Sequence, residues 1–197
     1  SKQKTLFFAI TFFLLISFPT FAVAQGGTAH VGVLQPSEIP LGGSLQLPVS
    51  VENVQELYAL DITMKFDPTI VQVEDADPGN PGTQIALGEF LDPGLLLFNV
   101  ADNEAGTIRF AMSQYNPSEG KSGKGVVLVI TFTGKAEGET ELSVTEIVLS
   151  DKNGVEIPAE GVDATLVISA GAATQAATYP VVEATGMIVL NTFTPTP

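Results

Sequence analysis

The stretch from Leu57 to Val73 limits the possible folds more than any other part of this sequence. In its first half, apolar residues occupy every second position, at Tyr58, Leu60, Ile62, Met64 and Phe66. The positions between them hold small, polar or charged residues, namely Ala59, Asp61, Thr63 and Lys65. This period of two predicts a strand with one buried and one exposed face. Asp67-Pro68 interrupts the pattern, because proline lacks a backbone N–H, and an apolar strand resumes at Ile70. A strand, a corner and a second strand are typical of half a β-sandwich.

Similar short apolar segments recur along the chain, separated by turns rich in Gly, Pro, Asn and Asp. We expect about nine strands, at residues 29–34, 45–51, 58–66, 70–73, 95–101, 107–115, 126–133, 141–149 and 162–168. No segment has the period of a three-turn amphipathic helix, and we expect at most one helical turn, at residues 85–90. The sequence therefore predicts an all-β fold, an antiparallel β-sandwich of jelly-roll type. Its expected core includes Leu60, Ile62, Met64, Phe66, Phe110, Val127, Val129 and Ile168.

The two ends of the chain differ in composition from the predicted sandwich. Residues 1–24 combine Lys2 and Lys4 with an apolar run and a small-residue cleavage site, as a secretory signal peptide does. An uncleaved N-terminal anchor is the alternative. We expect one domain at residues 25–169 and a flexible Ala/Thr/Pro-rich linker or tail at residues 170–197. Because the chain starts at Ser1 and ends on a Thr/Pro run, we expect it to be part of a longer protein.

Charge and cysteine content restrict the partners and the compartment. The 197 residues carry a formal net charge of −14 and contain no cysteine. Without Lys2 and Lys4, 22 acidic residues remain against 6 basic ones. Such a surface argues against binding of nucleic acid or anionic membranes and favours solubility outside the cell. We therefore expect a secreted or cell-surface protein whose fold is held by packing and not by disulfides.

The sequence gives no support for catalysis or for a bound cofactor. Its single histidine, His30, has no cysteine to pair with, so the usual nucleophile–base pairs are missing. The acidic residues cluster in predicted turns, where solvated loop charge explains them without a hydrolytic role. Asp151 to Gly154 begins like a calcium loop but lacks the glutamate that closes one, and a β-turn explains it equally. We expect no enzyme activity, no cofactor and no metal site.

Three segments in order resemble the cohesin domain of cellulosome scaffoldins and related surface proteins. They are LYALDITMKFDPTIVQV from Leu57, GTIRFAMSQYN from Gly106 and GKGVVLVITFTGKAEG from Gly123, within a resemblance that runs from about His30 to Ile168. The resemblance implies a dockerin-like helical partner, assembly of extracellular polysaccharide-degrading complexes or surface complexes, and contact with polysaccharide only through such complexes. It also implies that any calcium belongs to the partner, because dockerins carry EF-hand-like loops. Asp61 matches the family's recognition aspartate, whereas Ala59 stands where the family often has Asn.

The resemblance places the partner on one sheet face, formed by the strands predicted around residues 57–66, 95–101, 107–115 and 141–149. Strand alternation assigns nine residues to that face: Ala59, Asp61, Thr63, Leu95, Leu97, Asn99, Arg109, Ala111 and Ser113. Two exposed leucines with a polar rim would suit a docking helix. The alternative is that residues 85–91 cover Leu95 and Leu97. Arg109 either pairs with Asp61 or meets an acidic group of the partner.

Two other functions stay open from the sequence. A structural spacer of an S-layer or adhesin-type surface protein would use the same sandwich without binding a dockerin. A carbohydrate-binding module would also share the architecture, but such modules usually need an aromatic platform. This chain has no Trp and three Tyr, of which Tyr58 is predicted to point into the core.

Overall fold

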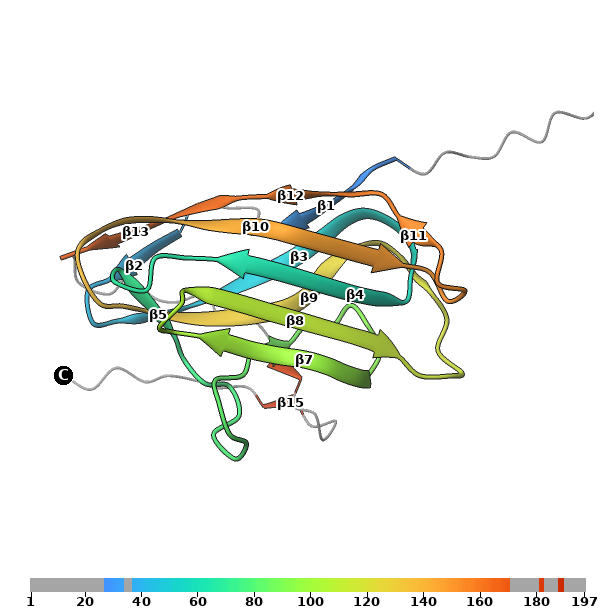
Figure 1. Cartoon of the computed structure of the whole chain (residues 1–197), viewed down its shortest axis with the longest axis horizontal. Helices are drawn as coiled ribbons and strands as arrows, with labels where there is room; N and C mark the ends of the chain where they lie inside the picture. The colour runs from blue at the N-terminus through green and yellow to red at the C-terminus, as the bar shows by residue number, and fades with distance from the viewer. Residues whose placement is uncertain (1–26, 34–36, 171–180, 183–187, 190–197) are drawn as a thin grey trace, which may run out of the picture.

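The computed structural model describes residues 27–33, 37–170, 181–182 and 188–189. All regular elements in these ranges are strands, and they form two sheets that pack face to face (Figure 1). No helix among the described residues is long and apolar enough to cross a membrane. The prediction of an all-β sandwich of jelly-roll type is confirmed.

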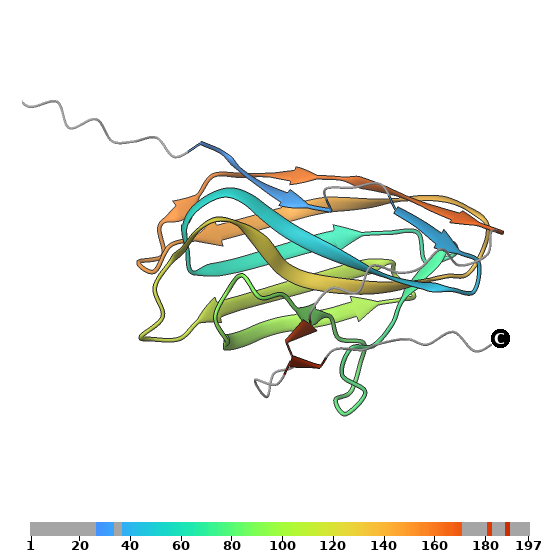
Figure 2. The ribbon, with the colours of Figure 1, turned by 180° about the vertical axis from the view of Figure 1, so that it is seen from behind.

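The first sheet is built around two long strands, β3 (Ser44–Leu57) and β9 (Lys121–Gly134), which run side by side in cyan and yellow in Figure 2. β1 (Ala29–Gly32) and β12 (Ala159–Val162) extend the sheet beyond β3. On the other side, β9 pairs with β5 (Val71–Val73) and with β6 (Ala86–Leu87) at separate points along its length. β14 (Val181–Val182) and β15 (Ile188–Val189) follow β6.

The second sheet faces the viewer in Figure 1 and has the order β2-β13-β10-β4-β8-β7. Its members are β2 (Ser37–Pro40), β13 (Ala164–Ser169), β10 (Gly138–Ser150), β4 (Ala59–Lys65), β8 (Thr107–Gln114) and β7 (Gly94–Asp102). The short β11 (Glu156–Ile157) pairs with the end of β10. β4, the strand with the clearest alternation in the sequence, lies between β10 and β8.

The nine predicted strands are present as β1, β3, β4, β5, β7, β8, β9, β10 and β13. The structure differs from the expected fold in two details. β1–β12 and β2–β13 are parallel pairs, so the sandwich is not purely antiparallel. Residues 85–90 form no helical turn. Ala86 and Leu87 are instead drawn into β6 by pairing with Val129 and Leu128, a tertiary contact that overrides the local sequence.

The predicted terminal segments are described only in part. The predicted signal peptide, residues 1–24, lies outside the described residues. Within the predicted linker, Val181–Val182 pairs with Ile188–Val189, and Val182 pairs with Leu87 of β6. Two short strands therefore lie where the sequence predicted none.

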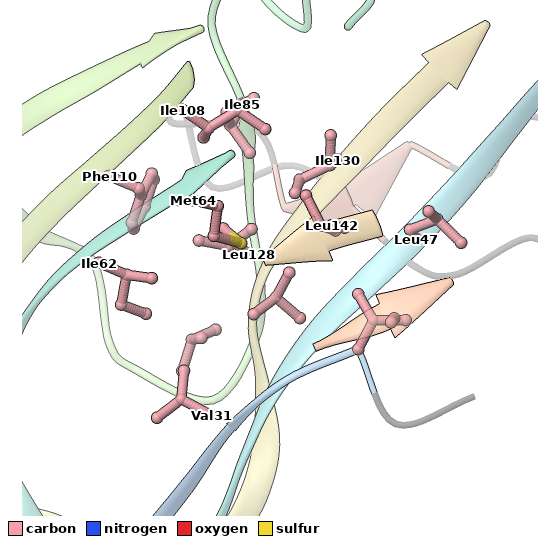
Figure 3. Close-up of a cluster of buried hydrophobic side chains, with 14 of the residues drawn as sticks. Val31, Leu47, Ile62, Met64, Ile85, Ile108, Phe110, Leu128, Ile130 and Leu142 are labelled. Atoms are coloured by element: carbon pink, nitrogen blue, oxygen red, sulfur yellow. The ribbon is translucent and has the colours of Figure 1, made fainter. Parts of the chain in front are cut away.

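The core lies between the two sheets and uses the apolar face of nearly every strand. Figure 3 shows Met64, Ile108 and Phe110 from one sheet on the same side of the cluster as one another, with Leu128 and Ile130 from the other sheet next to them. The eight predicted core residues are all buried, with exposed fractions of 0–6%. Tyr58 is also buried, as predicted. The Phe66 and Phe132 rings meet edge to face with centroids 5.3 Å apart, an arrangement that aromatic pairs favour.

Candidate functional site

The outer face of the β10-β4-β8-β7 half of the second sheet holds the candidate site, which we call the β4 face. Register across these strands places its residues in three rows. The rows are Ser150–Ala59–Ser113–Leu95, Val148–Asp61–Ala111–Phe98 and Glu146–Thr63–Arg109–Val100. Seven predicted site residues therefore lie together on this face: Ala59, Asp61, Thr63, Leu95, Arg109, Ala111 and Ser113.

A β-bulge in β7 changes the assignment of the remaining residues. The register shifts between Leu96 and Phe98, so Leu97 is the extra residue. Before the bulge the face carries Leu95, and after it the face carries Phe98 and Val100. Gly94, the first residue of this strand, lies very close to the backbone of β8. A Cβ at this position would lie 2.0 Å from the carbonyl oxygen of Ser113.

Asn99 does not lie on the β4 face, and its prediction as a site residue was wrong on this point. It pairs with Phe110, which is fully buried, so its side chain points to the inner side of the sheet. There Asn99 Oδ1 accepts from the Ile85 N–H at 2.7 Å, and Asn99 Nδ2 donates to the Ile85 carbonyl at 2.9 Å. The strict alternation assumed from the sequence fails here because the bulge shifts the alternation by one residue.

The structure resolves the question of whether residues 85–91 cover the leucines of β7. Leu95 is 46% exposed and Leu97 is 56% exposed, so neither is covered. Phe98, Val100 and Val148 on the same face are exposed to a similar degree. Sequence reasoning missed these three. Phe98 and Val100 were hidden by the bulge, whereas the alternation of β10 could have revealed Val148. Together they form an exposed apolar patch, a feature typical of interaction surfaces.

An ion pair lies at the centre of the β4 face. Arg109 Nη2 donates to Asp61 Oδ2 at 2.8 Å and Arg109 Nε donates to Asp61 Oδ1 at 3.3 Å, so the contact is bidentate. The hydrogen bond to Asp61 raises the pKa of Arg109 above its ordinary value. The guanidinium also lies over the Phe98 ring, 3.8 Å from its centroid. Of the two roles expected for Arg109, the free chain shows the pairing with Asp61.

A hollow of about 170 Å³ opens on the β4 face beside this ion pair. Ala59 and Ala111 line it where larger side chains would fill it, together with Leu97 and Phe98 from β7 and Val148 from β10. Asp61 and Ser150 supply polar atoms, and Leu60 and Met112 complete the lining. The hollow is thus mainly apolar with a polar rim, which suits a large apolar group of a partner.

Next to the hollow, but outside its lining, β10 carries the acidic residue Glu146. Glu146 is exposed, and Thr63 Oγ1 donates to its Oε2 at 3.4 Å. Glu146 also acts on Arg109 through space and favours its charged form. The three rows contain two acidic residues, Asp61 and Glu146. Asp61 pairs with Arg109, whereas Glu146 is in none of the ion pairs found among the described residues.

Elsewhere in the described residues, no group of side chains is suited to binding a metal ion. Among those residues, no cluster of three or more His, Asp or Glu side chains has the required placement. At the suspected calcium loop, Asp151 Oδ1 accepts from the backbone N–H groups of Asn153 and Val155. These bonds lower the pKa of Asp151, with the Val155 bond contributing most. The turn explanation of this sequence is therefore the one that the structure supports.

Comparisons with known proteins agree on one family. The cohesin domain family matches residues 31–168 of this chain. A non-cellulosomal cohesin from Archaeoglobus fulgidus superposes with a TM-score of 0.56 at 21% identity, covering 72% of this chain and 90% of the other. A type II cohesin from the cellulosome of Acetivibrio cellulolyticus gives a TM-score of 0.59 at 18% identity, covering 71% and 94%. No curated protein matches the chain.

A third structure is a type I cohesin–dockerin complex from Clostridium thermocellum. It matches with a TM-score of 0.58 at 15% identity and covers 72% of this chain and 92% of the other. At such low identities these likenesses show a shared fold and leave the functional residues to be argued from this chain's own surface.

Proposed function

The chain belongs to the cohesin family through residues 31–168, and from this premise we propose that it is a non-catalytic module that binds a dockerin-like helical partner. The observation that carries the proposal is the exposed apolar patch of Leu95, Leu97, Phe98, Val100 and Val148 on the β4 face. Large apolar side chains placed together on a sheet face favour association with another protein.

The proposal includes a location and a biological setting. The predicted signal peptide and the acidic composition support secretion or display at the cell surface. Solved relatives from cellulosomes support a role in assembling extracellular polysaccharide-degrading complexes or surface complexes. Any calcium in such a complex would belong to the dockerin-like partner, as the resemblance implies, and we propose no cofactor for this chain.

Two alternatives make different demands on the β4 face. A structural spacer needs no exposed apolar patch, whereas this chain keeps five large apolar residues on one face. A carbohydrate-binding module needs open aromatic rings. The Phe98 ring on this face has the Arg109 guanidinium against it, which disfavours its use as a stacking platform for sugars.

The test is a binding assay against purified dockerin modules, including those encoded in the same genome as this chain. Isothermal titration calorimetry would compare the wild-type chain with Leu97→Asp on the β4 face. Leu41→Asp is the matched control, because Leu41 is exposed to a similar degree, 47% against 56% for Leu97, but lies outside the site at its bridge to Gly134.

We expect at least one dockerin module to bind and Leu97→Asp to weaken it by about tenfold or more, as loss of a central apolar contact does. Leu41→Asp should leave the affinity unchanged. Failure of every module to bind would favour the spacer, and equal affinity of both variants would move the interface away from this face.

A further inference from the structure

The ion pair and the hollow together indicate which part of the β4 face contacts the partner. We propose that the hollow receives one large apolar side chain from a partner helix that carries basic residues beside it. In this proposal Asp61, held in place by Arg109, forms part of the wall of the hollow and does not itself bind the partner. The inference rests on the proposed function in taking the partner element to be a helix.

Asp61 is already occupied in the free chain. Both of its carboxylate oxygens accept hydrogen bonds from Arg109, with Nη2 at 2.8 Å and Nε at 3.3 Å. Bidentate pairs of this kind are geometrically specific, and this one fixes the carboxylate and uses one acceptor site on each of its oxygens. Arg109 is in turn held from the other side by the Phe98 ring at 3.8 Å. The three groups therefore form a continuous layer from β4 across β8 to β7.

The hollow beside this layer has the size and polarity for one apolar side chain. Its volume is about 170 Å³. An apolar cavity of about 150 Å³ in a protein interior accepts a benzene molecule. Ala59 and Ala111 form its floor, while Leu97 and Phe98 on one side and Val148 on the other supply the apolar walls. A leucine or phenylalanine of the partner would bury these walls, whereas a polar group would find few hydrogen-bond partners.

The spacing of the walls fits a single helix. β10 and β7 are separated by β4 and β8, which places them about 14 Å apart at the usual strand spacing. A helix with its side chains is about 10–12 Å across. One helix therefore fits between Val148 and the leucines of β7, with one of its side chains over the alanine floor.

The charge of this surface favours a partner helix that carries basic residues. Glu146 does not line the hollow, but it lies on β10 two residues before Val148, which does, and its negative charge remains because Arg109 pairs with Asp61. The chain as a whole is acidic, with a net charge of −14. Lysine or arginine next to the inserted apolar residue would face Glu146, whereas an acidic helix would be repelled.

The test uses short amphipathic helical peptides as probes and the full chain labelled on its methyl groups for NMR. The first peptide carries one central leucine flanked by lysines. In the second, alanine replaces the leucine, and in the third, glutamates replace the lysines. We expect the first peptide to give saturable shifts of the Ala59, Leu97 and Val148 methyl groups, and each change to weaken binding by about tenfold or more.

Variants of the chain separate the hollow from the rest of the sheet. Ala59→Leu fills the hollow and should abolish the shifts of the Leu97 and Val148 methyl groups. Thr165→Leu adds the same apolar side chain to exposed Thr165 in β13, outside the hollow, and should leave them unchanged. Val148→Ser removes one apolar wall without adding volume, so it serves as a second test in case Ala59→Leu disturbs the fold. It should also abolish the Leu97 shift.

A double-mutant cycle tests whether Asp61 only forms part of the wall or binds the partner directly. If Asp61 acts only through Arg109, Asp61→Ala should have no further effect in the Arg109→Ala background. A tenfold loss from Asp61→Ala in that background would overturn the inference, as would the absence of saturable shifts with the leucine peptide. The proposed function fails separately: it fails when no dockerin module binds. A dockerin module that binds Ala59→Leu as tightly as wild type would refute the hollow alone.

Discussion

Replacement of Asn99 by alanine tests the bulge in β7 and, with it, the assignment of the whole β4 face. In the structure, the Asn99 amide bonds both the N–H and the carbonyl of Ile85, a residue that is only 2% exposed. Alanine would leave both backbone groups without these partners. An unsatisfied buried polar group costs about 1–3 kcal/mol, so we expect Asn99→Ala to lower the free energy of unfolding by about 2–4 kcal/mol.

A second asparagine makes the same contact elsewhere and serves as a positive control. Asn103 Oδ1 accepts from the Val73 N–H at 2.8 Å, and Asn103 Nδ2 donates to the Val73 carbonyl at 2.9 Å. Val73 is 3% exposed, so Asn103→Ala should cost about as much as Asn99→Ala. Leu97→Ala is the negative control, because Leu97 is 56% exposed and surface changes usually stay within about 0.5 kcal/mol.

The assay is equilibrium unfolding in urea, with the free energy taken from the midpoint and the slope. An unchanged slope would show that the variants unfold from the same compact state. If Asn99→Ala cost no more than Leu97→Ala, Asn99 would lie on the exposed face. The alternation without a bulge would then be correct, and Phe98 and Val100 would have to leave the patch.

Three further predictions concern the core, the acidic turns and the C-terminal segment. Phe110→Ala should cost about 3–5 kcal/mol, because Phe110 is fully buried and its removal leaves a cavity; an unchanged thermal midpoint would mean that the two faces of β8 are exchanged. The pKa of Asp102 is lowered because its carboxylate accepts hydrogen bonds from the Ala105 and Glu104 N–H groups. Its contribution to stability is therefore present above about pH 4 and is lost as the pH falls through the lowered pKa. Asp102→Asn keeps an acceptor but does not titrate there, so it should reduce the loss of stability in acid, whereas Glu137→Gln controls for the change in net charge. Truncation after Ser169 should leave the thermal midpoint unchanged, because β14 joins the sheet through the single pair Val182–Leu87; a lower midpoint would make residues 170–197 part of the folded domain.

Local pattern was sufficient to predict most of the fold. The alternation in β4 depends only on neighbouring residues, and it correctly separated Leu60, Ile62 and Met64 from Ala59, Asp61 and Thr63. Antiparallel register then places Arg109 and Ala111 on the same face, since side chains on paired strands share a face in fixed order. The possible Asp61–Arg109 pair was predicted for the same reason.

The tertiary structure decided what depends on partners distant in sequence. Residues 85–90 carry no strong local signal, and the exposed edge of β9 made two of them a strand. β2 and β12 are parallel additions whose pairing with β13 and β1 no local turn could indicate.

The bulge shows most clearly where prediction from sequence ends. Leu95 to Phe98 are all apolar, so their hydrophobicity allows either register. The register was settled by a polar contact: Asn99 points inward because the Ile85 backbone needs a partner there, and the bulge carries Phe98 outward to Arg109. By itself, the sequence determined the two faces of β4, because alternation is a property of a single strand. The hollow depends on four strands meeting at fixed distances, and only their packing could create it.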